Sequence, residues 1–260
     1  MSVPSIPAVS RAYRATSPWR PGAAILGGIL IAGLAVAASV LAGAITLALV
    51  GGTAALRPSQ IRAAFDNPAH AAVWGTALAQ QAGAILGVAW LAGWFRGRRR
   101  SVLALDADVP SVRTVLVGLA WMAVLLIPYS LLIYHFQRDA MMRDLGNFTG
   151  MIQSQMWPAY ALMIVVGAPL SEELLFRGFL QSSLSQSRLG FAGAALVTTT
   201  AWTALHLQYS IYGLIEVFMI GLFLSWMLWR TGSLWTPILL HGIYNGLQFM
   251  AMRLKLLPWM

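Results

Sequence analysis

The chain has 260 residues, of which 58% are hydrophobic and 10% charged, against about 25% charged in a typical soluble domain. A soluble fold of this length cannot bury so much apolar surface, because even a large single domain buries only about three quarters of its chain's surface. The net charge of +9 is explained by cations at the ends of membrane spans, and no basic face with interleaved aromatic residues indicates nucleic-acid binding. Cysteine is absent, which excludes disulfides and thiol catalysis.

Apolar runs in chain order predict an all-α bundle in the membrane with about seven transmembrane helices, each of about 20 residues. The expected spans cover residues 23–56, 71–95, 115–136, 157–184, 191–207, 211–229 and 234–252. Residues 1–22 are rich in proline and arginine and are expected to be a disordered cytoplasmic lead. Ten arginines then lie on the side of the N-terminus, against six arginines and lysines on the other side, which places the N-terminus in the cytoplasm.

The acidic residues divide by type, since all five aspartates are expected in loops whereas all three glutamates fall inside spans. An ionisable group inside the bilayer costs roughly 2.5 kcal/mol or more, so each glutamate is a candidate for function. Glu173 and Arg177 are one helical turn apart and are expected to form a neutralising pair. Glu172 then points to another side of the helix without a partner. Glu216 lies near the outer end of its span, where it can reach the interface, and is left out of the predicted site.

Two of the four histidines lie inside spans. His70 and His135 are at span ends, where histidine is an ordinary interfacial residue. His206 and His241 fall in the fifth and seventh expected spans, and Asn245 follows His241 by four residues, which places imidazole and amide on one helical face.

Glu172 and His206 are separated by a polar segment that lies midway between them. In an antiparallel pair of helices, residues equidistant from the turn lie at the same depth. His241 is close to the start of its helix, so the depths agree only if several residues between 182 and 190 are not helical or if the hairpin extends into the cytosol. The sequence therefore predicts either a non-helical turn in this segment or a hairpin that projects from the membrane.

A carboxylate, two imidazoles and an amide in an apolar pocket suit the activation of a water molecule. Glu172 would act as general base and His206 would orient the water, while His241 and Asn245 would donate hydrogen bonds to an oxyanion. The predicted reaction is hydrolysis of an acyl or peptide bond within or beside the bilayer. Glu172, His206 and His241 could also form a three-ligand site for a divalent metal such as zinc, although no HExxH motif is present; a reaction without metal is equally open.

Three motifs resemble those of one family. The segment 168–178 contains Glu172-Glu173 followed by Arg177 and resembles the EExxxR motif of the CPBP family, the CAAX proteases and bacteriocin-processing enzymes also called Abi. Residues 202–206 resemble its FxxxH motif with Trp202 in place of phenylalanine, and residues 241–245 resemble its HxxxN motif. The resemblance covers about residues 157–249.

The resemblance implies an intramembrane endopeptidase in which Glu172 activates water with the help of His206. Glu173 and Arg177 would support the site, and His241 with Asn245 would form the oxyanion site. The implied substrate is a membrane-embedded or lipid-anchored peptide or protein, and the expected location is a bacterial plasma membrane. The predicted organisation is membrane helices over residues 23–156, a catalytic core over 157–253 and a tail over 254–260.

Two alternatives belong to other functional classes. The first is a non-catalytic scaffold or immunity protein of the same fold. The second is a proton-coupled transporter that uses Glu216 and the paired glutamates as a relay. The sequence leaves the choice between a metalloprotease and a glutamate protease open.

Overall fold

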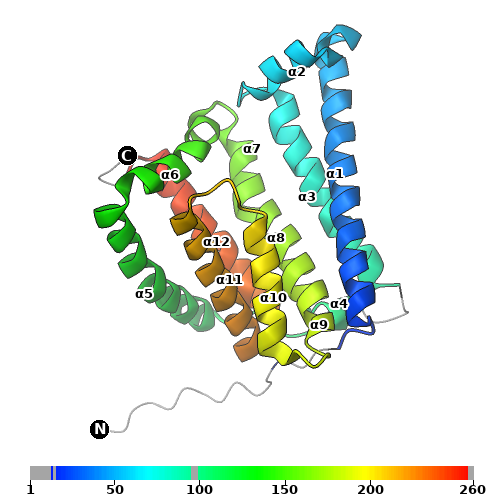
Figure 1. The fold of residues 1–260 in the computed structure, drawn as a ribbon, viewed down its shortest axis with the longest axis vertical. Helices are drawn as coiled ribbons and strands as arrows, with labels where there is room; N and C mark the ends of the chain where they lie inside the picture. Colours follow the sequence, from blue (N-terminus) through cyan, green and yellow to red (C-terminus); the bar gives the residue numbers. More distant parts are fainter. Residues whose placement is uncertain (1–12, 14–15, 95–98, 257–260) are drawn as a thin grey trace.

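The computed structural model describes residues 13, 16–94 and 99–256, and every secondary-structure element within these ranges is helical (Figure 1). The N-terminal part is a hairpin in which α1 (Pro21–Gly51) packs along α3 (Ala71–Ala92). The connection between them contains η1 (Thr53–Leu56) and α2 (Pro58–Phe65). His70 caps the N-terminus of α3 by accepting a hydrogen bond from the Ala72 N–H, which is a structural role at a helix end.

The middle part contains α4 (Arg99–Val102), α5 (Val112–Phe136) and α6 (Arg138–Gln153). Figure 1 shows α5 and α6 on the side of the molecule opposite to α1 and α3, with the helices from α7 to α12 between them. The expectation that all five aspartates lie in loops is wrong for Asp139 and Asp144, which belong to α6. The physical reason is that α6 is amphipathic: apolar residues at helical spacing give it a buried face even though it is too polar for a membrane span.

The fourth expected span is a continuous helix over residues 157–184 with changes of winding along it. Its segments are α7 (Trp157–Ala161), η2 (Leu162–Gly167), α8 (Ala168–Glu172), η3 (Glu173–Gln181) and α9 (Ser182–Leu184), of which η2 and η3 are π-helical. Such stretches are rare in proteins and are frequent at functional sites. The two glutamates of the first motif lie at the junction of α8 and η3.

Three more helices complete the bundle: α10 (Gly190–Ala204), α11 (Ile211–Thr231) and α12 (Trp235–Arg253). Among the described residues, four helical segments are long and apolar enough to cross a membrane: Pro21–Gly51, Val112–Phe136, Trp157–Leu184 and Ile211–Thr231. The predicted count of seven is therefore not confirmed. With 15 residues, α10 is shorter than a typical span, and α12 carries the polar residues of the third motif.

Part of the segment that was expected to be disordered packs against the bundle. The Ser17 and Ser183 hydroxyls are 2.7 Å apart, and the Gln186 amide donates to the Ser17 carbonyl at 2.6 Å. The Tyr13 backbone N–H donates to the Trp229 carbonyl at 3.3 Å. Residues 13 and 16–20 therefore cover the end of the bundle, and Pro21 already begins α1. Residues 1–12, 14–15, 95–98 and 257–260, which include parts of the expected lead, of the arginine cluster and of the tail, lie outside the described residues.

An apolar cluster surrounds the centre of the C-terminal half. It joins buried side chains from α5, η3, α10, α11 and α12, namely Met122, Leu126, Phe176, Trp202, Ile220, Phe223, Leu224, Met227 and Leu240. Close packing of this kind holds neighbouring side chains in fixed rotamers. Trp202 of the second motif belongs to this cluster.

Candidate active site

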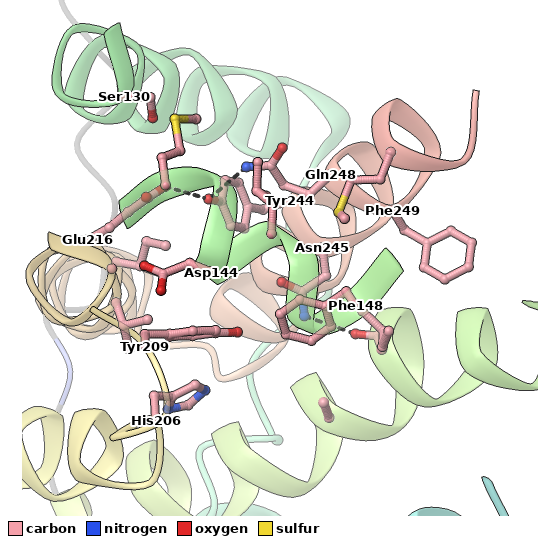
Figure 2. Close-up of a pocket in the computed structure, with 18 of the residues that line it drawn as sticks. Ser130, Asp144, Phe148, His206, Tyr209, Glu216, Tyr244, Asn245, Gln248 and Phe249 are labelled. Carbon is pink, nitrogen blue, oxygen red and sulfur yellow. Dashed lines mark hydrogen bonds between the residues drawn. The ribbon is translucent and has the colours of Figure 1, made fainter. Parts of the chain in front are cut away.

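A cavity of about 370 Å³ opens between α5, α6, α8, α10, α11 and α12. Glu172, His206, His241 and Asn245 all line it, together with a larger number of apolar and aromatic side chains. Figure 2 shows His206 and Asn245 at this cavity, with the Tyr209 ring beside His206. The structure therefore brings together four of the six predicted site residues, and the other two, Glu173 and Arg177, are fully buried.

The predicted turn makes this meeting possible. Residues 185–189 are not helical, so η3 and α10 run back along each other from a short connection. The Trp202 indole on α10 donates to the Glu172 Oε2 atom on α8 at 2.6 Å. This hydrogen bond directly links the first and second motifs across 30 residues of sequence.

One carboxylate oxygen of Glu173 accepts hydrogen bonds from two residues. The Arg177 Nη1 atom lies 3.0 Å from Glu173 Oε1, and the His241 Nδ1 atom lies 2.9 Å from the same oxygen. The expected Glu173–Arg177 pair is thus present, but it also holds the histidine of α12. Because a carboxylate oxygen accepts, His241 Nδ1 carries the proton and its Nε2 atom is left for other partners.

His206 lies in the turn directly after α10 and not inside a helix as expected, and the last turn of α10 holds its ring. Its Nδ1 atom lies 3.0 Å from the Trp202 carbonyl oxygen, and because a carbonyl can only accept, this nitrogen is the donor. The Nε2 atom of His206 is therefore left for other partners. Tyr209 stacks on the imidazole with ring centroids 5.7 Å apart. Burial, reinforced by neighbouring carboxylates, raises the pKa of the Tyr209 phenol well above its usual value.

Asn245 is anchored to the first π-helical segment. Its amide donates to the Ile164 carbonyl at 2.9 Å, and Gln81 from α3 donates to the neighbouring Met163 carbonyl at 3.1 Å. Gly242 allows this approach, because a Cβ atom there would lie 2.8 Å from the Val165 carbonyl oxygen. The side chain of Asn245 thus has a fixed position, with one amide hydrogen used and the other still available.

Glu216, which the sequence analysis left out of the predicted site, lies at the same cavity as the predicted site residues. Glu216 lines the same cavity and accepts from the Tyr244 hydroxyl at 2.9 Å, as Figure 2 shows. The reason is that α11 packs beside α12, which turns residue 216 inward. Its position inside a span was already a signal for function, and Tyr244 follows His241 by three residues on the same helical face.

Asp144 also lines the cavity, although the sequence had suggested a loop residue. Its carboxylate accepts from the Ser210 N–H at 2.8 Å and from the Ser210 hydroxyl at 2.6 Å. Ser210 is the N-cap residue of α11, so this contact ties α6 to the beginning of α11. No local pattern in the sequence announces a contact between residues 66 positions apart.

The possible metal ligands do not form a complete set. In the part of the chain that the structure describes, no three histidine or acidic side chains are grouped so that they could share one cation. Glu172, His206 and His241 do not form such a group. The Nδ1 atoms of both His206 and His241 donate to protein acceptors, so only the Nε2 atom of each ring is available to another partner.

Comparison with known proteins finds similarities in the second half of the chain. Residues 154–247 match the family model "Type II CAAX prenyl endopeptidase Rce1-like", and this segment contains all six predicted site residues. The chain is also 40% identical over 83 residues to an uncharacterized 24.3 kDa protein of Escherichia coli. That alignment covers 31% of this chain and 38% of the relative. No solved structure matches the chain.

Proposed function

We propose that this chain, whose residues 154–247 match the model of a type II CAAX prenyl endopeptidase family, is an intramembrane protease of the CPBP family. It would cleave a peptide bond of a membrane-embedded or lipid-anchored substrate with a water molecule activated by Glu172. One observation carries the proposal: Glu172 on α8, His206 in the turn after α10, and His241 and Asn245 on α12 line a single, mainly apolar cavity. Polar residues capable of general base catalysis and of oxyanion binding thus face the same cavity.

The two sides of the cavity support different parts of the reaction. The lone pair of His206 Nε2 and the free oxygen of Glu172 can both accept a hydrogen bond from one water molecule. Glu172 takes a proton from this water while the water oxygen bonds to the carbonyl carbon of the substrate, and the π electrons of the carbonyl move to its oxygen. Holding the reactants in this way lowers the entropic part of the barrier.

The opposite side supports the oxyanion. The Glu173 carboxylate stabilises a positive charge on His241, whose Nε2–H then donates to the oxyanion together with the free amide hydrogen of Asn245. When the oxyanion collapses, the C–N bond breaks and its electron pair leaves with the amine nitrogen. That nitrogen takes the proton from Glu172, so one water and one peptide bond give a carboxylic acid and an amine.

The proposed setting is a bacterial plasma membrane with the N-terminus in the cytoplasm, as the arginine distribution indicates. The matched family takes its name from a CAAX prenyl endopeptidase. A prenylated peptide is therefore a suitable test substrate beside an unmodified transmembrane peptide. A non-catalytic scaffold is not favoured, because the matched family is one of endopeptidases.

The proposal is tested with Glu172→Gln, which keeps the size of the side chain but removes its basicity. We expect cleavage of both peptides in proteoliposomes to fall by about 100-fold or more, the contribution of a general base. Asp139→Asn serves as the matched control, because Asp139 is an exposed acidic residue of α6, and it should keep wild-type activity. Retained cleavage by folded Glu172→Gln would overturn the proposal.

A further inference from the structure

Trp202 stands in place of the phenylalanine of the FxxxH motif and is buried, with 2% relative exposure. Its side chain and backbone contact four of the predicted site residues. The indole donates to Glu172 at 2.6 Å and the backbone carbonyl holds His206 at 3.0 Å, while the ring centroid lies 5.6 Å from that of His241 and 4.4 Å from Arg177 Cζ. Trp202 therefore lies between the base side and the oxyanion side of the cavity.

The hydrogen bond to Glu172 has a fixed direction. An indole N–H can only donate, and a donor that faces a carboxylate makes a short, charge-assisted bond. Glu172 Oε2 is therefore occupied, whereas Oε1 has no protein donor among the residues that the structure describes. The indole thus decides which oxygen of the carboxylate is free to accept a proton.

The faces and edges of the same ring hold the other groups. The Arg177 guanidinium lies over the ring, a cation–π contact that is strongest with tryptophan. Arg177 in turn pairs with Glu173, which holds His241. Phenylalanine at this position could keep the ring contacts with Arg177 and the histidines, but it has no N–H for Glu172.

We propose that Trp202 is a positioning residue of the hydrolysis, which holds Glu172 so that Oε1 faces the attacking water. This inference rests on the proposed function of the site. Trp202 itself does not contact the reacting atoms in this role; it acts through the carboxylate. The replacement of phenylalanine by tryptophan in the second motif thus supplies a hydrogen bond that phenylalanine cannot make.

The first test compares Trp202→Phe with wild type in a kinetic assay on the same membrane peptide. We expect kcat to fall about 10- to 100-fold, the usual effect of losing a partner that orients a reacting group, while KM stays within about twofold because the cavity wall is retained. Trp226→Phe, at a half-exposed position of α11, should leave both constants unchanged. A wild-type kcat for Trp202→Phe, or a change confined to KM, would overturn the inference.

The second test needs neither activity nor a folded Trp202 variant. In wild-type protein labelled with ¹⁵N at the indole nitrogen of its 11 tryptophans, one indole N–H signal should lie far downfield and should move upfield in Glu172→Ala. If no indole signal moves, the contact is refuted. If Glu172→Gln retains cleavage, the proposed function and this inference both fall, whereas a fully active Trp202→Phe beside an inactive Glu172→Gln refutes this inference alone.

Discussion

The fully buried pair of Glu173 and Arg177 gives the sharpest prediction for stability. Replacing Arg177 by methionine removes the 3.0 Å ion pair, a 3.3 Å hydrogen bond to the Gly221 carbonyl and the cation–π contact with Trp202. Glu173, which has no exposed surface, then keeps only His241 as a partner. Breaking a buried pair from one side costs about 3–5 kcal/mol, which corresponds to a fall in Tm of about 6–20 °C.

The double variant separates charge from packing. In Arg177→Met combined with Glu173→Leu, both charges are replaced by apolar side chains of similar size, and such replacements are often neutral or stabilising. We therefore expect most of the lost Tm to return. Cleavage should stay lost, because His241 Nδ1 no longer has its carboxylate acceptor.

The assay is thermal unfolding in detergent, followed by circular dichroism, together with cleavage of the test peptide. Arg113→Met is the matched control, because Arg113 is exposed at the beginning of α5, and its unfolding free energy should change by less than about 0.5 kcal/mol. If the double variant unfolds at the same temperature as Arg177→Met, the stability loss does not come from an unpaired carboxylate and the reasoning is wrong.

Two further substitutions test the packing and the electrostatics around the cavity. Gly221→Ala should destabilise the protein by about 1–3 kcal/mol, because the new Cβ atom would lie 2.6 Å from Thr199 Cγ2 and 3.0 Å from Arg177 Nη2. Gly33→Ala in α1 is the matched control, because a Cβ atom there meets nothing within 4 Å. Equal Tm changes in the two variants would contradict this prediction. The raised pKa of Tyr209 contributes stability that is complete below about pH 10 and is lost as pH rises towards the folded-state value. The Tm of Tyr209→Phe should therefore fall less than the Tm of wild type between about pH 9 and 11. Parallel curves of Tm against pH for the two proteins would refute this prediction.

Several features of the site could be predicted because they depend on local geometry. The spacing of Glu173 and Arg177 places them one turn apart whether the helix is wound as an α-helix or slightly wider, and they do form an ion pair. The expected boundaries 157–184 agree with the continuous helix that the structure contains. The meeting of Glu172 with the second motif required only a short non-helical turn, and residues 185–189 provide it.

Other features could not be predicted because they depend on which surfaces pack together. Asp144 reaches Ser210 only because the amphipathic α6 covers the cavity, and the sequence does not say what an apolar helix face will contact. Glu216 faces the cavity because α11 packs on α12. The π-helical segments place carbonyl groups where Gln81 and Asn245 can bind them, and no residue pattern used in the sequence analysis indicated this winding.

The sequence by itself indicated that the protein is helical and belongs in a membrane, and it singled out six polar residues in its second half as candidates for its chemistry. Composition and spacing suffice for this, because lipid excludes charges that have no function and a helix fixes the positions of residues one turn apart. Only the tertiary structure decided which nitrogen of each histidine is free, which oxygen of Glu172 is held, and that Trp202 holds it. These properties arise from contacts between residues on different helices, and a hydrogen bond of this kind exists only after the helices have packed.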